Sequence, residues 1–414
     1  MNRFVLARRG LPLLLATLLG AACDDPKPAP DATTTASTAS ALATTTSSDT
    51  VPAAHTAAPE PAPKPGEAVE PAFNAAEYRK LVETLSEPDG DFFSDNFISN
   101  ETSYLQPTKL LASRPKGGAY IGVGPEQNFT YLAITEPELA FILDIRRDNL
   151  VLHLLYKAVF DLADSRSHFL ALLIGADHVA DGAPGADASI EEVLTHVERG
   201  ERTPQTFGAA HDLLRKRIAK TYGIELSAKD DKSLKRAHQA FFDEGLDIRF
   251  ELKENSTRKY PSLRELVSAT DPQGEQLGFL ATEKSFRTVQ RMQRENRVIP
   301  VVGDFAGDHA VSAIAALLKE KNEKVRHFYV SNVEQYLLVD GKWWKWQRNI
   351  EALPIDEHSA FIRGYLDQGK RHPDQMEGHR TATILQPMDA FTARKKPYRS
   401  MWALCSDGVI PTPD

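Results

Sequence analysis

Two patterns of apolar residues alternate along the chain after residue 119. Runs of consecutive apolar residues are typical of strands buried on both faces of a sheet, and between them apolar residues recur every three to four positions, as in amphipathic helices. The predicted strands are residues 119–124, 139–145, 298–305 and 325–332, and residues 360–365 and 381–385 are candidates to close the sheet. This order predicts an α/β fold with a mostly parallel sheet flanked by helices.

Helical periodicity precedes and separates these strands. The predicted helices cover residues 73–85, a segment that begins near Pro125, a long stretch at 149–173, and residues 309–319. Residues 175–295 break the alternation, because they read as mostly polar helices with one strand at 246–252. We therefore expect one α/β domain at residues 72–414 with a helical region inserted at about 175–295.

The first residues have the order of a bacterial secretory signal. Arg8 and Arg9 precede the apolar run at residues 11–19, and three small residues stand directly before Cys23. The apolar run is shorter than the roughly 20 residues that a membrane-spanning helix needs. We expect a signal peptide at residues 1–22 and a lipid on Cys23; an ordinary secretory signal cut near that cysteine is the alternative, and the two arginines leave twin-arginine export open.

Residues 23–71 have the composition of a disordered tether. They are rich in Ala, Thr, Ser and Pro and contain few aliphatic side chains. Such a segment cannot bury enough apolar area to offset the entropy that ordering costs. We expect it to link a lipid anchor in the membrane to the folded domain, which places the protein in the bacterial cell envelope, in the periplasm or on the outer surface.

Composition excludes several classes of function. The formal net charge is −8 at pH 7, so the chain has no basic surplus for phosphates and nucleic acid is not an expected partner. A lipid on Cys23 would leave Cys405, the second of two cysteines, without a disulfide partner. The twelve histidines form no metal motif, and Asp89, Asp91 and Asp95 lack the spacing of a calcium loop, so no metal is expected. Hydrolase and NTPase motifs are missing from the sequence. The oligomeric state is left open.

Residues at the carboxyl ends of three predicted strands outline a site for an adenosine-type ligand. Gly122 and Gly124 allow a ligand to approach the first turn closely, and a helix N-terminus follows them. Asp144 ends the second strand roughly 20 residues later, where a carboxylate accepts hydrogen bonds from ribose. Asp304 and Phe305 add a carboxylate and an aromatic face. The alternative is that both acids only cap helices.

This pattern resembles class I methyltransferases, in which S-adenosylmethionine lies over a glycine turn and beside two acids. The resemblance implies that Asp144 holds the ribose of S-adenosylmethionine, that Asp304 holds the adenine amino group, and that residues 331–336 face the methyl group. The candidates to face a substrate are Asn128, Tyr131, Asn332, Glu334 and Tyr336.

Longer segments are similar to a second, narrower group. Residues 92–101, 120–131 (YIGVGPEQNFTY), 144–147 and 300–307 resemble an uncharacterised bacterial family that includes spirochaetal lipoproteins with a methyltransferase-like Rossmann fold. The similarity covers about residues 73–364. It implies the fold and the envelope location, and it implies no particular activity.

Two functions remain open from the sequence. Glu126 replaces the third glycine of a dinucleotide-binding turn, and its charge would repel a carboxylate or pyrophosphate more than a positive sulfonium. The first function is therefore methyl transfer from S-adenosylmethionine to an unidentified acceptor. The second is a non-catalytic Rossmann-fold binding or scaffold lipoprotein. The expected location favours this second function, because S-adenosylmethionine is made in the cytoplasm and an exported protein would be separated from it.

The tryptophans at 343, 344 and 346 alternate with lysines, and we expect them to pack in a hairpin.

Overall fold

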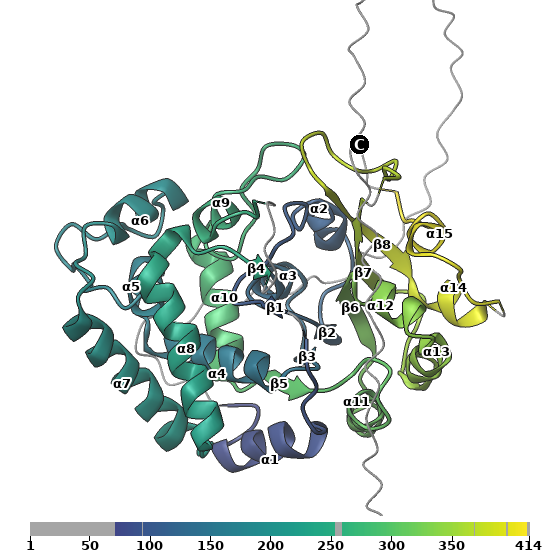
Figure 1. Ribbon diagram of the computed structural model, residues 1–414, viewed down its shortest axis with the longest axis horizontal. Coiled ribbons are helices and arrows are strands. Elements are labelled where there is room, and N and C mark those ends of the chain that lie inside the picture. Colours follow the sequence, from purple (N-terminus) through teal and green to yellow (C-terminus); the bar gives the residue numbers. More distant parts are fainter. Residues whose placement is uncertain (1–70, 93, 253–258, 368, 395, 412–414) are drawn as a thin grey trace, which may run out of the picture. The chain divides into compact units, whose positions relative to one another are not determined.

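The computed structural model describes residues 71–411 except 93, 253–258, 368 and 395 (Figure 1). The chain divides into the units Met1–Pro59 and Glu60–Asp414, and all described residues belong to the second. The predicted signal peptide and the lipid on Cys23 lie outside the described residues, as does nearly all of the predicted tether. Within the described part of the chain, every helix is too short or too polar to span a bilayer.

The main sheet of the described residues has six strands in the order β5-β3-β2-β6-β7-β8. All neighbouring strands are parallel except β7 and β8, which are antiparallel. Their bounds are β2 Ala119–Gly122, β3 Leu139–Asp144, β5 Val298–Val302, β6 Val325–Ser331, β7 Ala360–Leu366 and β8 Thr381–Pro387. Taken in chain order, these strands follow the 3-2-1-4-5-6 arrangement of the Rossmann fold, which confirms the predicted α/β class. The order reverses between β2 and β6.

Helices cover both faces of this sheet, and this explains its apolar strands. Every residue of β2, β3 and β5 is buried. On one side in Figure 1 lie α3 Gln127–Thr135, α4 Arg147–Leu162 and α10 Glu283–Arg294; on the other lie α11 Ala310–Glu320, α12 Val333–Val339 and α13 Trp343–Ala352. A strand covered on both faces gains from apolar side chains at every position, so the continuous apolar runs in the sequence are a consequence of the layering.

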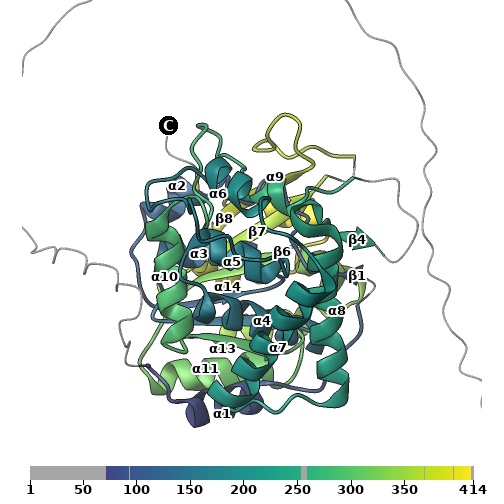
Figure 2. The same ribbon diagram turned by 90° about the vertical axis from the view of Figure 1, so that its left-hand side faces the viewer.

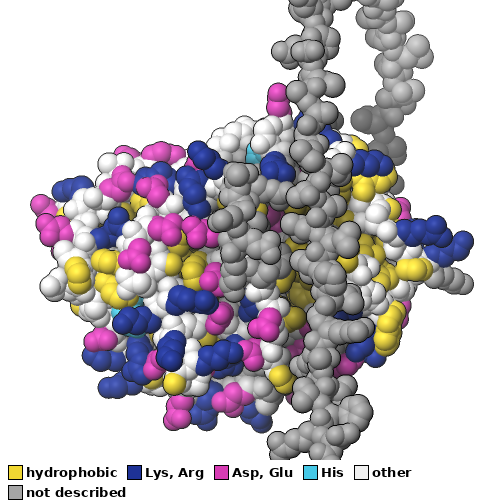
Figure 3. Space-filling model, in the orientation of Figure 1, with side chains coloured by type: hydrophobic (Ala, Val, Ile, Leu, Met, Phe, Trp, Pro, Cys, Tyr) yellow, Lys and Arg dark blue, Asp and Glu magenta, His cyan; other side chains and the backbone are white. Residues whose placement is uncertain are grey.

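The region that interrupts the alternation packs outside α4. Helices α7 Pro204–Thr221 and α8 Ala228–Glu244 contact α4, and Figure 2 shows them in front of the sheet. The region also contains α6 Ile190–Val197, η1 Gly245–Asp247, β4 Glu251–Leu252 and α9 Leu263–Val267, whereas α5 Arg166–Leu173 precedes it and α10 at its end packs with α3 and α4. Acidic and basic side chains are interspersed over this part of the surface in Figure 3. Serine caps begin α6, α8 and α9, each with an acid three residues later that completes a capping box.

Short elements complete the described part of the chain. Helix α1 Ala75–Leu85 agrees with the first predicted helix, and Asn74 caps it. The remaining elements are β1 Ser94–Asp95, α2 Thr108–Ala112, α14 Met388–Ala393 and α15 Met401–Cys405. Cys405 is a buried free thiol.

Three predicted elements are wrong in detail. The helix expected at 149–173 is divided into α4 and α5, because Ala163 has extended backbone and Ser165 caps α5 by accepting from the N–H of His168 at 3.1 Å. The strand expected at 246–252 is reduced to the two residues of β4, which pair with β1. The three tryptophans lie at the start of α13 instead of in a hairpin.

Candidate functional site

A cavity of about 730 Å³ lies at the carboxyl ends of four neighbouring strands. Its wall includes Gly124 after β2, Asp144 at the end of β3, Asp304 after β5, and Ser331 at the end of β6. Open α/β sheets bind ligands at this edge, next to the point where the strand order reverses. The volume lies in the range of roughly 300–1,000 Å³ that small-molecule sites occupy.

The structure brings six of the ten sequence-predicted site residues to this cavity. Those that line it are Gly124, Asp144, Asp304, Phe305, Asn332 and Tyr336. The remaining four are Gly122, Asn128, Tyr131 and Glu334, and each has other contacts within the protein.

Gly122 and Asn128 shape the turn that borders the cavity. A Cβ atom at Gly122 would lie 2.0 Å from Oδ1 of Asn128, so the glycine makes room for that side chain. The amide nitrogen of Asn128 donates to the carbonyl oxygens of Val123, Gly124 and Pro125 at 3.0, 3.2 and 2.8 Å. Gly124 has a φ of +79°, which favours glycine. Gly122 and Asn128 therefore do not line the cavity, but they fix the turn that borders it.

Asp144 is held in one orientation by Arg146. The backbone N–H and Nε of Arg146 donate to Oδ1 at 2.9 and 3.0 Å, and Nη2 donates to Oδ2 at 3.0 Å. Both residues are buried, with exposed fractions of 5% for Asp144 and 8% for Arg146. The guanidinium also donates to the carbonyl oxygen of Ser94 and lies 5.8 Å from the centre of the Phe92 ring. The carboxylate at the end of β3 is thus fixed before any ligand arrives.

Asp304 has a looser environment. Its Oδ1 accepts from the backbone N–H of Ala306 at 2.9 Å, and its Oδ2 accepts from Nζ of Lys342 at 3.2 Å. The Lys342 side chain is 44% exposed, so the ion pair is easily exchanged for another partner. Phe305 lines the cavity and stacks on Trp346 with ring centres 5.1 Å apart.

The end of β6 has an unusual backbone and a buried acid. Ser331 has a φ of +49°, and its hydroxyl donates to Oε1 of Glu101, which also accepts from the Tyr329 hydroxyl at 2.9 Å. Burial raises the pKa of the Glu101 carboxyl, and the two hydroxyl donors partly offset this effect. No hydrogen-bond partner of Glu101 Oε2 is found among the described residues. Strained backbone and an incompletely paired buried acid are more common at binding sites than elsewhere.

Tyr131 and Glu334 lie in the core. Glu334 pairs with Arg363 through contacts of 2.6 and 2.9 Å and accepts from Nε1 of Trp346 at 2.8 Å. The hydroxyl of Tyr131 donates to the carbonyl oxygen of Tyr104 at 2.9 Å. Both predicted positions are fully buried, and neither lines the cavity, so their placement gives no support to a role in facing a substrate.

Glu126 also differs from its predicted role. Both of its carboxylate oxygens accept from the backbone N–H of Ser99 at 3.1 Å, and the residue is not part of the cavity wall. Burial raises the pKa of Glu126 to about 7, although the Ser99 N–H lowers it. The expected repulsion of an anionic ligand by this side chain therefore has no geometric basis.

Several residues at or beside the cavity are not among the site candidates predicted from the sequence. Arg146 in the wall holds Asp144, Glu101 behind the wall holds Ser331, and Phe92, Phe250 and Tyr260 add aromatic surface to the wall. The Phe92 and Tyr336 rings meet edge to face at 5.6 Å. Arg146 and Glu101 lie inside the segments 144–147 and 92–101 that resemble an uncharacterised family, which was the available signal. Aromatic walls with a few fixed polar groups suit a flat heterocycle with polar substituents.

The fold and the position of the cavity define a Rossmann-like α/β protein with a small-molecule site at its strand ends. The chain belongs to the family described as Domain of unknown function (DUF7790), whose model matches residues 96–404. This finding confirms the predicted membership of an uncharacterised family, and the matched range contains most of the cavity wall. No curated protein matches the chain.

Proposed function

We propose that the cavity binds S-adenosylmethionine or a related nucleoside and that the protein transfers the methyl group to an acceptor. The observation that carries this proposal is the convergence of a glycine turn and two strand-end acids on one cavity of about 730 Å³. In this arrangement Asp144 accepts from the ribose hydroxyls and Asp304 accepts from the adenine amino group. Asn332 and Tyr336 lie on the side of the acceptor.

The charge of the cavity wall supports a cationic ligand. Among the described residues of the wall, the carboxylates of Asp91, Asp144, Asp304 and Asp340 outnumber the cationic side chains of Arg146 and Lys342. An excess of negative charge at short range attracts a sulfonium and repels a pyrophosphate. Methyl transfer requires mainly that the protein hold a nucleophile in line with the sulfur–carbon bond that breaks, in a site from which water is excluded.

A specific observation favours a second function. The carboxylate of Asp144 already accepts three hydrogen bonds from Arg146, and that of Asp304 accepts from Lys342 and a backbone N–H. Acids that are satisfied within the protein need no ligand, as expected for a Rossmann-fold scaffold without catalysis. In either function we propose an exported lipoprotein whose partner is the membrane, through a lipid on Cys23, in the bacterial envelope.

Calorimetric titration of S-adenosylmethionine and S-adenosylhomocysteine into the full chain separates the two functions. We expect binding with a Kd on the order of micromolar, and at least about tenfold weaker binding in each of Asp144→Asn and Asp304→Asn, because each loses one charge-assisted hydrogen bond. Glu357→Gln is the matched control, since its carboxylate is 79% exposed and it does not line the cavity. Absence of binding at millimolar ligand would replace the enzyme with the scaffold.

A further inference from the structure

Three potential metal ligands meet beside the inserted helices. Asp164 lies between α4 and α5, His168 lies in the first turn of α5, and His178 follows the end of α5. One ligand atom from each residue lies within 4.8 Å of the other two. Oδ1 of Asp164 is 3.0 Å from Nδ1 of His168, and the rings of His168 and His178 are parallel within 4° with centres 4.2 Å apart. None of the three residues lines the cavity.

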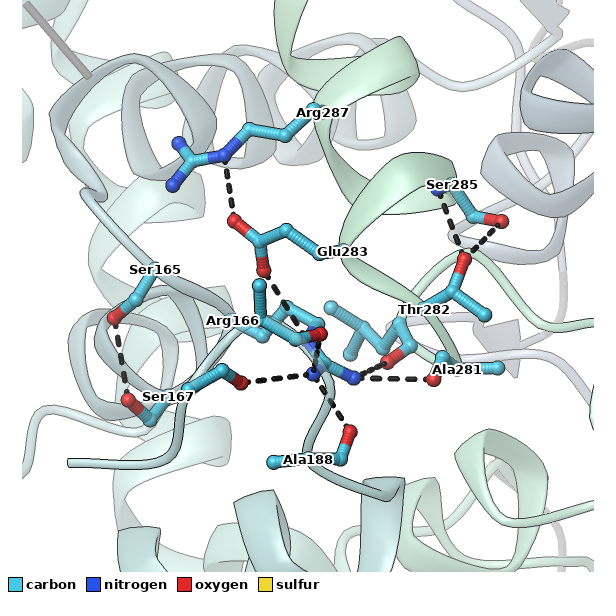
Figure 4. A network of polar contacts seen from close by, with 12 residues as sticks. Ser165, Arg166, Ser167, Ala188, Ala281, Thr282, Glu283, Ser285 and Arg287 are labelled. Carbon is cyan, nitrogen blue, oxygen red and sulfur yellow. Dashed lines mark hydrogen bonds and ion pairs between the residues drawn. The ribbon is translucent and has the colours of Figure 1, made fainter. Parts of the chain in front are cut away.

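The protein holds Asp164 and His168 in place from one side. Ser165 caps α5, and Nη2 of Arg287 donates to the carbonyl oxygen of Asp164 at 2.5 Å. Glu283 contacts Arg287 at 2.7 Å and Arg166 at 3.3 Å, as Figure 4 shows. Asp164 and His168 therefore extend from the connection between α4 and α5, which a buried polar network holds in place.

Arg166 is the centre of that network. It is 2% exposed, and its guanidinium donates to the carbonyl oxygens of Ala281 at 3.0 Å and Ala188 at 2.7 Å (Figure 4). Ala188 lies between α5 and α6, and Ala281 lies directly before α10, so the two carbonyls come from segments that are far apart in the sequence. Because one buried cation joins them, the start of α5 has little freedom to rearrange.

The loop that carries His178 is fixed from the other side. The backbone N–H of Asp177 donates to the carbonyl oxygen of Glu201 at 2.9 Å. Nε2 of His196 lies 2.7 Å from the carbonyl oxygen of Val179. Gly200 allows the approach of this loop, since a Cβ there would lie 2.2 Å from the carbonyl oxygen of Asp177. Both halves of the cluster thus rest on rigid supports, as metal sites require.

His178 has an unsatisfied group that an ion would pair. Its Nε2 is buried and has no hydrogen-bond partner among the described residues. A buried polar atom without a partner lowers stability unless something outside the protein chain satisfies it. The nitrogen lone pairs of the two imidazoles lie in parallel ring planes, so one ring must turn about its Cβ–Cγ bond before both nitrogens can coordinate the same cation.

We propose that Asp164, His168 and His178 form a binding site for a divalent transition metal ion of the zinc type. Two imidazole nitrogens and one carboxylate oxygen are ligands that suit Zn²⁺, and they suit Ca²⁺ or Mg²⁺ poorly. Asp164 and His168 have exposed side-chain fractions of 62% and 23%, so the ion reaches the site from solvent. Three protein ligands leave a fourth position for water or for a group of another molecule.

Titration of ZnCl₂ into the full chain, followed by calorimetry, tests the site. We expect one Zn²⁺ per chain with a Kd on the order of micromolar or tighter, weakened at least about tenfold in His168→Gln and in His178→Gln. Asp164→Asn should weaken binding less, because the amide oxygen still coordinates. Co²⁺ in place of Zn²⁺ should give the visible absorption of a four-coordinate site, and His178→Gln should lose it.

Two control variants make the test specific. His358→Gln changes an exposed histidine beside Glu357 and should leave Zn²⁺ affinity unchanged. His211→Gln changes the other close histidine pair, in which the Nδ1 atoms of His211 and His238 are 3.2 Å apart. The proposal is overturned if the wild-type chain does not bind Zn²⁺, if the two ligand variants bind it as the wild type does, or if His211→Gln alone removes binding. Circular dichroism establishes that each variant is folded.

Discussion

Two regions of the molecule each contain an acid paired with an arginine, and the two pairs differ in their surroundings. Asp144 and Arg146 form a pair in the wall of the cavity at the end of β3. Glu334 and Arg363 form a pair between α12 and β7, where their side chains are 0% and 1% exposed. Both acids are site candidates predicted from the sequence. The comparison shows that the chemistry of the side chains alone does not separate a binding group from a structural one.

The surroundings of the pairs make the distinction. The guanidinium of Arg363 lies 3.9 Å from the centre of the Phe361 ring and donates to Oε1 of Gln386 at 2.9 Å. Glu334 accepts from Trp346, so the partners of this pair are all inside the core. The pair of Asp144 and Arg146 borders a space in which water or a ligand can replace a lost contact. The first pair serves the fold, and the second is free to serve a ligand as well.

The largest expected effect compares the two pairs directly. Glu334→Gln leaves the charge of Arg363 buried without a counterion, and we expect a loss of about 3–5 kcal/mol in the free energy of unfolding. Asp144→Asn should lose only about 1–2 kcal/mol, because Arg146 borders the cavity, where water can take the place of the lost carboxylate. Chemical denaturation of both variants beside Glu357→Gln measures the difference. Equal losses in the two variants would mean that the cavity wall is as sealed as the core.

Glu126 extends the comparison to a buried acid without a cationic partner. Its pKa is raised from the ordinary 4.5 to about 7, chiefly by burial. The folded protein therefore binds more protons than the unfolded chain between these two pH values, and stability falls as the pH rises through this window. At pH 8 the loss is at most about 3.5 kcal/mol, since each pKa unit corresponds to about 1.4 kcal/mol.

Glu126→Gln should remove this pH dependence. The variant keeps an oxygen that accepts from the N–H of Ser99, and it has no charge to bury. Below about pH 6.5, buried His153, His238 and His327 produce the opposite slope in both proteins, because burial lowers the pKa of each to about 4, 4 and 3. The measured quantity is consequently the difference between wild type and variant at pH 5 and pH 8. A difference that does not change with pH would contradict the raised pKa.

The sheet and the position of the cavity followed from the sequence, because both depend on local patterns. Continuous apolar runs mark strands covered on two faces, and acids or glycines directly after such runs lie at one edge of a parallel sheet. These rules located Gly124, Asp144 and Asp304 on one cavity.

The side-chain contacts that local patterns do not predict depend on partners that are distant in the chain. Glu334 has Arg363 as its partner only because α12 packs on β6, the neighbour of β7, and Glu126 meets Ser99 only through the loop before α2. A short segment such as the tryptophans at 343–346 fits strand and helix periodicity equally well, and tertiary packing decides between them. The role of Arg146 does not follow from the sequence, because its pairing with Asp144 requires the turn geometry at the end of β3.

The smallest expected effect concerns backbone strain in the cavity wall. Ser331 has a φ of +49°, whereas Glu334 and Arg363, the pair in the core, do not have a positive φ. Ser331→Ala and Ser331→Gly both lose the hydroxyl that donates to Glu101, so they differ only in the Cβ atom. The left-handed conformation costs alanine roughly 1–2 kcal/mol, and the greater freedom of glycine in the unfolded chain takes back about 0.4–1 kcal/mol. Denaturation should therefore find the glycine variant more stable by about 0.5–1 kcal/mol. If the alanine variant is as stable, the end of β6 adopts an unstrained backbone in solution, and the contrast between a strained cavity wall and a relaxed core no longer holds.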